Sequence, residues 1–244
     1  MSRLSPTRFL ASVRSVEEAR LCVDAGADII DCKDPDRGAL GALPYDVVRA
    51  IKRQMPPDVP VSATIGDLIA EPAVLRTAVK AMAATGVDYV KVGFFPGGDA
   101  KASIEALGSL LLGTQLQLVG LLLADRNPDF ALIAPMAAAG FSGVMVDTAA
   151  KDGGALPDVL SLADLRAFVT ASTRVGLFAG LAGSLRLEHV PELLALKPNL
   201  LGFRGALCRA GDRRSVLDPD AIEAVREAIP EAARAQSMPQ KVMS

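Results

Sequence analysis

The feature of this sequence that most restricts its fold is an eightfold alternation of short β-rich segments with longer segments of helical periodicity. Apolar residues recur at helical spacing between the predicted strands, and several helical segments begin at Ser, Asp or Pro and end at Gly, as helices do. Eight strand-helix units in about 250 residues suit a closed barrel, whereas a doubly wound sheet usually has about five or six strands. The predicted strands cover residues 9–13, 27–33, 61–65, 88–93, 117–124, 143–148, 175–180 and 200–205.

The composition of the predicted strands indicates a parallel sheet that helices cover on both faces. Residues 117–124 and 143–147 are almost continuously apolar, which is typical of strands buried by helices on each side. We therefore predict an α/β protein with a single (β/α)8 TIM barrel in residues 1–230. Residues 231–244 show no clear periodicity, so we expect a frayed C-terminal tail.

Charge and hydropathy exclude several classes of protein. Lys and Arg number 26 against 28 Asp and Glu, which leaves no basic excess for a nucleic-acid partner. The longest apolar run, residues 116–124, is too short to span a bilayer, and the N-terminus has no apolar signal-peptide segment. We expect a soluble cytoplasmic protein with no membrane partner.

Cysteine and histidine argue against a metal site. The three cysteines, Cys22, Cys32 and Cys208, are widely spaced, and His189 is the single histidine. We expect free thiols and no metal. Strand alternation turns Cys32 away from the face shared by its neighbours, so it is interpreted as a small buried hydrophobe. His189 is expected to have a solvated structural role in a helix.

Three lysines lie at or just beyond the ends of predicted strands, where barrels of this kind carry their chemistry: Lys33, Lys91 and Lys151. Asp31 precedes Lys33 by two residues, so alternation points both side chains into one pocket, and Asp147 precedes Lys151 by four. Lysine is depleted in strands and rarely buried without a partner. The placement indicates amine chemistry on a carbonyl substrate.

Two interpretations of these charges remain open. An amine attacks a carbonyl only when unprotonated, which burial or a second cation such as Lys91 or Lys151 favours, whereas a nearby carboxylate keeps another lysine charged. Alternatively, Asp31 with Lys33 and Asp147 with Lys151 form two structural ion pairs.

The loops after the seventh and eighth strands predict a phosphate site. Phosphate is commonly held there in such barrels, and glycine lets backbone N–H groups approach an anion. Turn glycines and a helix cap are the alternative. The candidate ligands are Gly180, Gly183, Ser184, Arg204 and Gly205, which predicts a phosphorylated small molecule as substrate.

The segment after Lys33 is long for a strand-helix loop and rich in Gly and Pro. It could order over a substrate as a lid, or be an ordinary surface loop. Ser62, Thr64 and Asp67 near the third strand could bind substrate hydroxyls, and Asp67 could instead cap a turn.

Five short motifs, taken together, resemble those of the (5-formylfuran-3-yl)methyl phosphate synthases over residues 9–229. They are Asp31-Cys-Lys33-Asp34-Pro, Lys91-Val-Gly93, Val146-Asp147-Thr148 with Lys151, Gly180-Leu-Ala-Gly-Ser184 and Gly202-Phe-Arg-Gly-Ala206. The resemblance implies a (β/α)8 lyase that condenses two molecules of glyceraldehyde 3-phosphate, loses one phosphate and water, and closes a furan ring for methanofuran or methylofuran biosynthesis. No metal or organic cofactor is implied.

The resemblance also implies roles for the charged residues. By position, Lys33 matches the lysine that forms a Schiff base and Lys91 the lysine that transfers protons. Asp31, Asp147 and Lys151 match the supporting charges.

Three further expectations concern alternatives and assembly. Asp31, Lys33 and Asp36 have the D-x-K-x-x-D spacing of the orotidine-phosphate decarboxylase group, which stabilises a carbanion without a covalent bond, although Lys91 and Lys151 then have no task. A second alternative is non-enzymatic: the barrel binds a phosphorylated metabolite and serves as a regulatory or assembly subunit. Helices rich in Ala and Leu, such as residues 134–140, favour a homo-oligomer.

Overall fold

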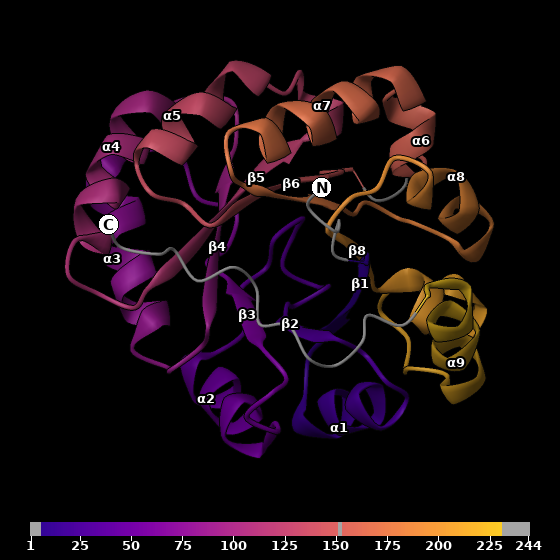
Figure 1. Cartoon of the computed structure of the whole chain (residues 1–244). Helices are drawn as coiled ribbons and strands as arrows, with labels where there is room; N and C mark the ends of the chain where they lie inside the picture. The colour runs from indigo at the N-terminus through magenta and orange to yellow at the C-terminus, as the bar shows by residue number, and fades with distance from the viewer. Residues whose placement is uncertain (1–5, 151–152, 231–244) are drawn as a thin grey trace.

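Eight parallel strands close into a barrel in the computed structural model, which describes residues 6–150 and 153–230 (Figure 1). Each strand pairs with the next along the chain, and the last pairs with the first, so no sheet edge is left open. The predicted barrel is confirmed. The strands are β1 (Arg8–Val13), β2 (Ile29–Cys32), β3 (Val61–Thr64), β4 (Tyr89–Phe94), β5 (Gln117–Leu123), β6 (Gly143–Asp147), β7 (Phe178–Leu181) and β8 (Leu200–Phe203).

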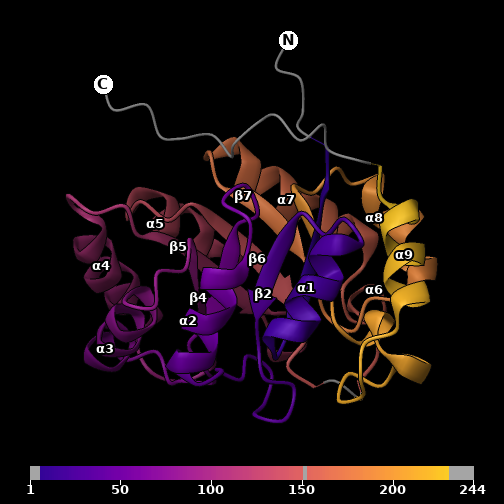
Figure 2. The same cartoon turned by 90° about the horizontal axis from the view of Figure 1, so that it is seen from below.

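Helices surround the barrel on its outside (Figures 1 and 2). Two segments whose periodicity predicts a helix, residues 129–140 and 184–196, each form a 3-10 turn followed by a short helix. The helices are α1 (Val16–Asp24), α2 (Tyr45–Gln54), α3 (Pro72–Ala83), α4 (Ala100–Leu111), α5 (Ile133–Ala138), α6 (Leu156–Val159), α7 (Leu162–Arg174), α8 (Val190–Leu194) and α9 (Pro219–Ala228).

Several helices begin where their sequences predict. The side chains of Ser15, Asp99, Ser161 and Asp218 each accept a hydrogen bond from a backbone N–H in the first turn of the following helix. These caps satisfy donors that the helix leaves unpaired and so fix the point at which each strand-helix connection ends.

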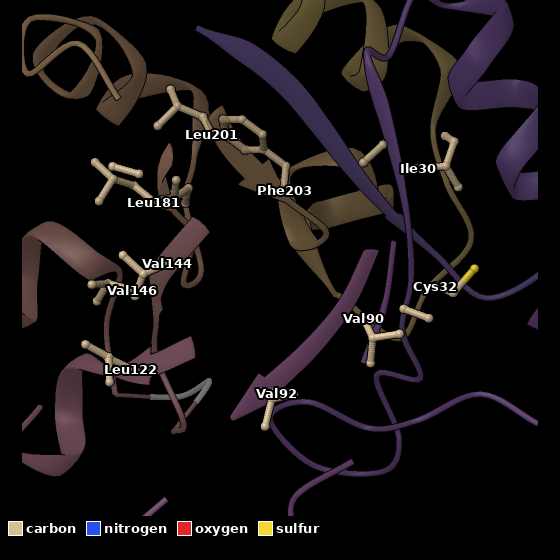
Figure 3. Close-up of a cluster of buried hydrophobic side chains, with 14 of the residues drawn as sticks. Ile30, Cys32, Val90, Val92, Leu122, Val144, Val146, Leu181, Leu201 and Phe203 are labelled. Carbon is tan, nitrogen blue, oxygen red and sulfur yellow. The ribbon is translucent and has the colours of Figure 1, made fainter. Parts of the chain in front are cut away.

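Alternation along the strands separates two apolar layers. Side chains that face outward, such as Ile30, Val90, Val146 and Leu201, pack between the barrel and the helices (Figure 3). Side chains that face inward fill the lumen and include Leu10, Ile29, Tyr89, Val119, Leu121, Met145 and Leu200. This inner layer forms an apolar floor across the lumen, and further polar inward-facing positions lie above it, toward the carboxyl ends of the strands.

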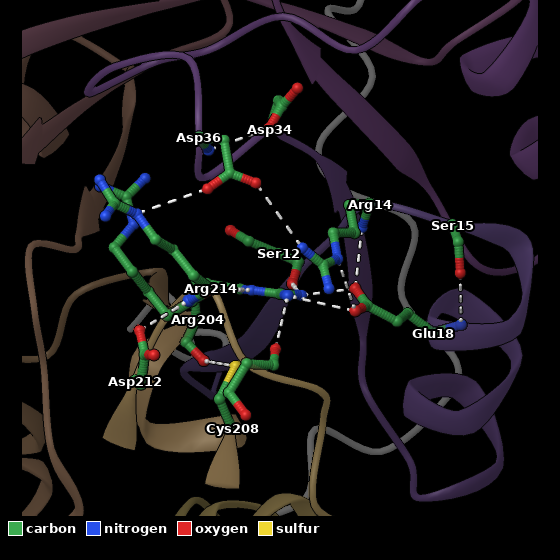
Figure 4. A network of polar contacts seen from close by, with 12 residues as sticks. Ser12, Arg14, Ser15, Glu18, Asp34, Asp36, Arg204, Cys208, Asp212 and Arg214 are labelled. Carbon is green, nitrogen blue, oxygen red and sulfur yellow. Dashed lines mark hydrogen bonds and ion pairs between the residues drawn. The ribbon is translucent and has the colours of Figure 1, made fainter. Parts of the chain in front are cut away.

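A largely buried ion pair links the end of the last strand to the first helix. Arg204, which follows β8, places its guanidinium against both carboxylate oxygens of Glu18 in α1 (Figure 4), with Nη2 3.1 Å from Oε1. The same guanidinium donates to the backbone carbonyls of Ser12 and Arg213. Burial alone would lower the pKa of Arg204, but the hydrogen bond and charge of Glu18 raise it above its ordinary value.

Replacing Glu18 with Ala should lower the free energy of unfolding by about 3 kcal/mol or more, because it leaves a guanidinium buried beside carbonyls alone. Chemical denaturation monitored by circular dichroism measures the change. Glu17→Ala is the matched control, since Glu17 is fully exposed in the same helical turn, and it should change stability far less. Equal losses in the two variants would show that helix capping, and not the ion pair, matters.

None of the helices in the described ranges 6–150 and 153–230 is long and apolar enough to cross a membrane. The tail at residues 231–244, for which fraying is predicted, lies outside the described residues.

Candidate active site

The site is built on a polar row above the apolar floor of the barrel. The strand register places Ser12 of β1, Asp31 of β2 and Ser62 of β3 side by side. Both serine hydroxyls donate to the Asp31 carboxylate, Ser62 to Oδ1 at 2.6 Å and Ser12 to Oδ2 at 3.1 Å. Ser62 therefore orients the buried Asp31 carboxylate, a role different from the predicted contact with substrate hydroxyls.

Two lysine-aspartate pairs cross the mouth of the barrel. Lys91 Nζ lies 2.8 Å from Asp31 Oδ2, and Lys33 Nζ lies 2.9 Å from Asp147 Oδ2. All four side chains are buried, with Lys91 only 3% exposed and Lys33 8%. Asp147 also accepts a hydrogen bond from the backbone N–H of Thr148. The two ammonium groups are thus held in place by carboxylates from other strands.

The pairing of Lys33 differs from the structural alternative that joins it to Asp31. Alternation does bring Asp31 and Lys33 to the same face, but each forms its ion pair with a residue from another strand and not with its neighbour in sequence. Lys151, the other predicted partner of Asp147, lies outside the described residues.

The four charged residues share one cavity of about 620 Å³. Leu10 and Met145 of the apolar floor also line it, so the four charged groups lie between an apolar base and the loops above the strands. A volume of this order accommodates a small phosphorylated metabolite. Because both amines face the same space, both can act on one bound substrate.

Four of the five predicted phosphate ligands line this cavity: Gly183, Ser184, Arg204 and Gly205. Gly180 does not, because it lies within β7, where a Cβ would meet Met145 and Leu200 below the mouth. The five N–H groups of the Arg204 guanidinium already donate to Glu18 and to the carbonyls of Ser12, Arg213 and Ser215, so only the backbone of Arg204 is a candidate for binding an anion.

Gly183 shows why glycine is needed in the loop after β7. Its φ of +115° lies in a region that side-chain-bearing residues rarely adopt, and a Cβ would lie 2.8 Å from the backbone nitrogen of Thr148. Its carbonyl also accepts a hydrogen bond from the N–H of Leu156. The loop after β7 therefore packs tightly against the loop after β6, at the edge of the cavity.

Gly183→Ala should lower the free energy of unfolding by about 1–3 kcal/mol through backbone strain and this close contact. Thermal unfolding checks the change. Gly176→Ala is the matched control, because Gly176 also has a positive φ, +82°, but an added Cβ would meet nothing within 4 Å. If both variants lose the same stability, the contact with Thr148 contributes nothing and only the φ angle is costly.

The loop after Lys33 is fixed by contacts on several sides. The carboxylate of Asp67 accepts the N–H groups of Ala39 and Leu40, and the hydroxyl of Thr64 donates to the carbonyl of Gly41. The side chain of Leu40 is fully buried in the inner apolar layer. Thr64 and Asp67 thus support this loop, and the capping alternative for Asp67 fits the structure better than contact with a substrate.

Sequence inspection missed Arg213. It follows β8 in the segment between the 3-10 turn at Arg209–Gly211 and α9, lines the cavity, and donates from Nη2 to the carbonyl of Gly38 at 3.2 Å. Burial lowers the pKa of Arg213, the Asp147 carboxylate opposes this, and the guanidiniums of Arg214 and Arg204 reinforce it. No motif marks this position, because its relation to the cavity depends on how a long loop folds back.

Asp36, the third residue of the D-x-K-x-x-D spacing, lies away from the lysines. Its side chain is 57% exposed and pairs with Arg14 at 3.7 Å and Arg214 at 3.4 Å (Figure 4). It does not line the cavity that holds Lys33. This arrangement disfavours the decarboxylase-like interpretation for this chain.

Cys32 and His189 have structural environments. Cys32 packs in the outer apolar layer, and burial raises the pKa of its thiol far above the ordinary value, which disfavours a nucleophilic role. The prediction for Cys32 is confirmed. His189 is 7% exposed, not solvated as predicted, because its Nδ1 accepts the backbone N–H of Arg186 and its ring closes a 3-10 turn.

The model of the 4-HFC-P synthase family matches residues 9–226, which is most of the chain and includes both lysine-aspartate pairs. The chain belongs to the 4-HFC-P synthase family. Because this family is named for a synthase, the chain is a member of an enzyme family, and the resemblance recognised in its motifs is confirmed.

The relatives of this 4-HFC-P synthase family member align with it over nearly their whole length. The (5-formylfuran-3-yl)methyl phosphate synthase of Methanocaldococcus jannaschii is 35% identical over 230 residues, covering 90% of this chain and 98% of the relative. The synthase of the same name from Methanopyrus kandleri is 36% identical over 91% of this chain and 98% of its own. A Methylorubrum extorquens protein, provisionally given the same name, is 43% identical over 90% and 92%.

Solved structures confirm the fold of the family member. Phosphoribosyl anthranilate isomerase from Thermus thermophilus aligns with a TM-score of 0.63 at 17% identity, covering 91% of this chain and 98% of that one. 3-Hexulose-6-phosphate synthase from Salmonella typhimurium aligns with a TM-score of 0.64 at 18% identity, covering 90% and 98%. At these identities the likeness concerns the barrel alone.

Proposed function

We propose that this chain condenses two molecules of glyceraldehyde 3-phosphate into (5-formylfuran-3-yl)methyl phosphate through a Schiff base on Lys33. The reaction would serve biosynthesis of a methanofuran or methylofuran type of cofactor. The observation that carries the proposal is the presence of two buried lysines, each paired with an aspartate, in one cavity beside the glycine-containing loop after β7. Membership of the synthase family supports it.

The position of Asp147 supports Lys33 as the nucleophile. Its Oδ2 lies 2.9 Å from Lys33 Nζ, within the reach of direct proton transfer. The amine that results attacks the aldehyde carbon, and the carbinolamine loses water to give an iminium ion. The iminium withdraws electrons from the adjacent carbon, so loss of a proton there gives a nucleophilic enamine.

Lys91 is suited to move protons at the attached triose. It lies in β4, faces the same cavity as Lys33, and is held by the Asp31 carboxylate, which Ser12 and Ser62 orient in turn. An ammonium fixed in this way can protonate an oxygen that develops charge during carbon-carbon bond formation, and can promote loss of a phosphate or hydroxide leaving group.

The proposed reaction balances without an oxidant or a reductant. Two triose phosphates form one carbon-carbon bond between the enamine of one and a carbonyl carbon of the other, and then close a ring through oxygen. Elimination of one inorganic phosphate and two molecules of water gives the furan aldehyde, and hydrolysis of the imine returns Lys33. The remaining phosphate ester stays on the product.

Two measurements on the purified protein test the proposal. Purified protein mixed with glyceraldehyde 3-phosphate should develop furan absorbance and release one phosphate for every furan formed. Borohydride reduction during the reaction, followed by mass analysis of peptides, should find a triose adduct on Lys33. Turnover without any trapped adduct would favour non-covalent carbanion chemistry, and binding without turnover would favour a non-enzymatic role.

A further inference from the structure

A second cavity, of about 680 Å³, adjoins the one that holds the lysines. The two cavities share Pro35 of the loop after β2, and Asp212 and Arg213 of the loop after β8. These loops extend from the same end of the barrel (Figure 2) and touch where Arg213 donates to Gly38. The second cavity therefore opens directly beside the reactive groups.

The second cavity is rich in guanidinium groups. Among the described residues, Arg126, Arg213 and Arg214 line it, and its carboxylates belong to Asp67 and Asp212. Both oxygens of Asp67 already accept backbone N–H groups of the loop after β2, at 2.9 and 2.6 Å. Asp212 accepts the backbone N–H of Arg214 at 3.0 Å. The described lining thus has three cations, and both of its carboxylates already accept hydrogen bonds from the protein backbone.

Two of the three arginines have no carboxylate partner among the residues that the structure describes. Arg214 pairs with Asp36 at 3.4 Å (Figure 4). Within residues 6–150 and 153–230, no carboxylate lies at ion-pair distance from Arg126 or Arg213. Guanidinium groups that face a cavity without a counter-ion favour binding of an anion, and their planar donors match phosphate oxygens.

Arg126 and Arg213 both lie near β6 and the loop that follows it, where Asp147 pairs with Lys33. Arg126 ends the 3-10 turn that follows β5, and its neighbour Asp125 holds this turn against the loop after β6 by accepting the N–H groups of Ala149 and Ala150 at 2.6 Å. Arg213 is close enough to Asp147, the partner of Lys33, for their charges to interact. An anion bound by both arginines would therefore lie in the cavity next to the one that contains the Lys33 amine.

We propose that Arg126 and Arg213 bind the phosphate of a second triose phosphate, the one that reacts with the triose attached to Lys33. The inference rests on the proposed function, which needs two phosphorylated substrates in the mouth at once. The loops after β7 and β8 hold the phosphate of the attached triose, and the arginine-lined cavity holds the other. Arg213 lines both cavities and brings the two substrates together.

The test compares Arg126→Ala, Arg213→Ala and the double variant with the wild-type chain. The triose concentration that gives half-maximal furan formation should rise by roughly 10- to 100-fold in each single variant, as expected for loss of a charge-assisted hydrogen bond. The adduct trapped on Lys33 by borohydride should form at unchanged triose concentration, since only the second substrate is affected. Arg213→Lys should restore part of the loss because it keeps the charge.

Arg37→Ala is the matched control. Arg37 lies in the loop after β2, is 67% exposed, pairs with Asp34, and lines neither cavity, so this variant should behave as wild type. Unchanged half-saturation in the double variant would overturn the second site. Loss of the trapped adduct in that variant would also overturn it, because the arginines would then serve the first triose.

Calorimetric titration with inorganic phosphate separates this inference from the proposed function. Wild-type protein should bind two phosphates per chain, and the double variant one. If the wild-type chain forms no furan but this difference is observed, the proposed reaction fails while the anion site stands. Equal phosphate binding by the wild type and the double variant would refute the site whatever the reaction is.

Discussion

Replacing Lys33 with Ala should reduce furan formation by roughly 10⁴-fold or more, because the variant has no amine with which to form the covalent intermediate. The adduct that borohydride traps should disappear as well. Initial rates of furan absorbance and mass analysis of the reduced protein measure the two effects. Residual activity within tenfold of the wild type would contradict a Schiff base at this position.

The loss must be separated from unfolding, because Lys33→Ala leaves the buried Asp147 carboxylate without this cation. Lys33→Arg addresses this point. Its guanidinium keeps a positive charge beside Asp147 but stays protonated and forms no imine. We expect a cooperative thermal transition near that of the wild type and no turnover. If Lys33→Arg unfolds while a folded Lys33→Ala remains active, the lysine is structural.

Lys52→Ala is the matched control for the removal of a lysine-aspartate pair. Lys52 lies in α2 and pairs at 2.6 Å with Asp88, which immediately precedes β4 and is therefore at the opposite end of the barrel. This variant loses an ion pair of similar geometry and should retain the wild-type rate. A comparable loss of activity in Lys52→Ala would show that the effect of Lys33 is not specific to the cavity.

The sequence predicted the barrel and the face on which each lysine lies, because both follow from the local periods of strand and helix. It did not predict which aspartate each lysine meets. That choice depends on how eight strands are staggered around the closed barrel, which brings Asp147 of β6 to Lys33 and Asp31 of β2 to Lys91. Proximity in sequence was therefore a poor guide to ion pairing.

The roles of two arginines were even harder to predict from the sequence than the lysine-aspartate pairs. Arg204 stood in the predicted phosphate loop, yet its guanidinium is bound by Glu18, which is 186 residues away in the chain. Arg213 stood in no motif, yet it lines both cavities. The role of each depends on long-range contacts of the β8 loop, and a single sequence carries no periodic signal for such contacts.

Replacing Lys91 with Ala should lower the rate of furan formation by about 10²–10⁴-fold, the range typical of a lost general acid or base. In contrast to the Lys33 variants, it should still yield the borohydride-trapped adduct, because the nucleophile and Asp147 are intact. The two measurements together assign the lysines to different steps: Lys33 to attachment of the first triose, and Lys91 to proton transfer afterwards.

The buried position of Lys91 requires a second variant. Lys91→Ala leaves Asp31 with the hydroxyls of Ser12 and Ser62 but without its cation, which costs stability. Lys91→Gln keeps an N–H donor near the carboxylate and carries no transferable proton, so it should be folded, trap the triose and turn over slowly. A full rate in folded Lys91→Gln would remove Lys91 from the chemistry. Loss of the adduct in the same variant would instead place Lys91 in attachment of the first triose, and the division of labour between the two amines would have to be reversed or abandoned.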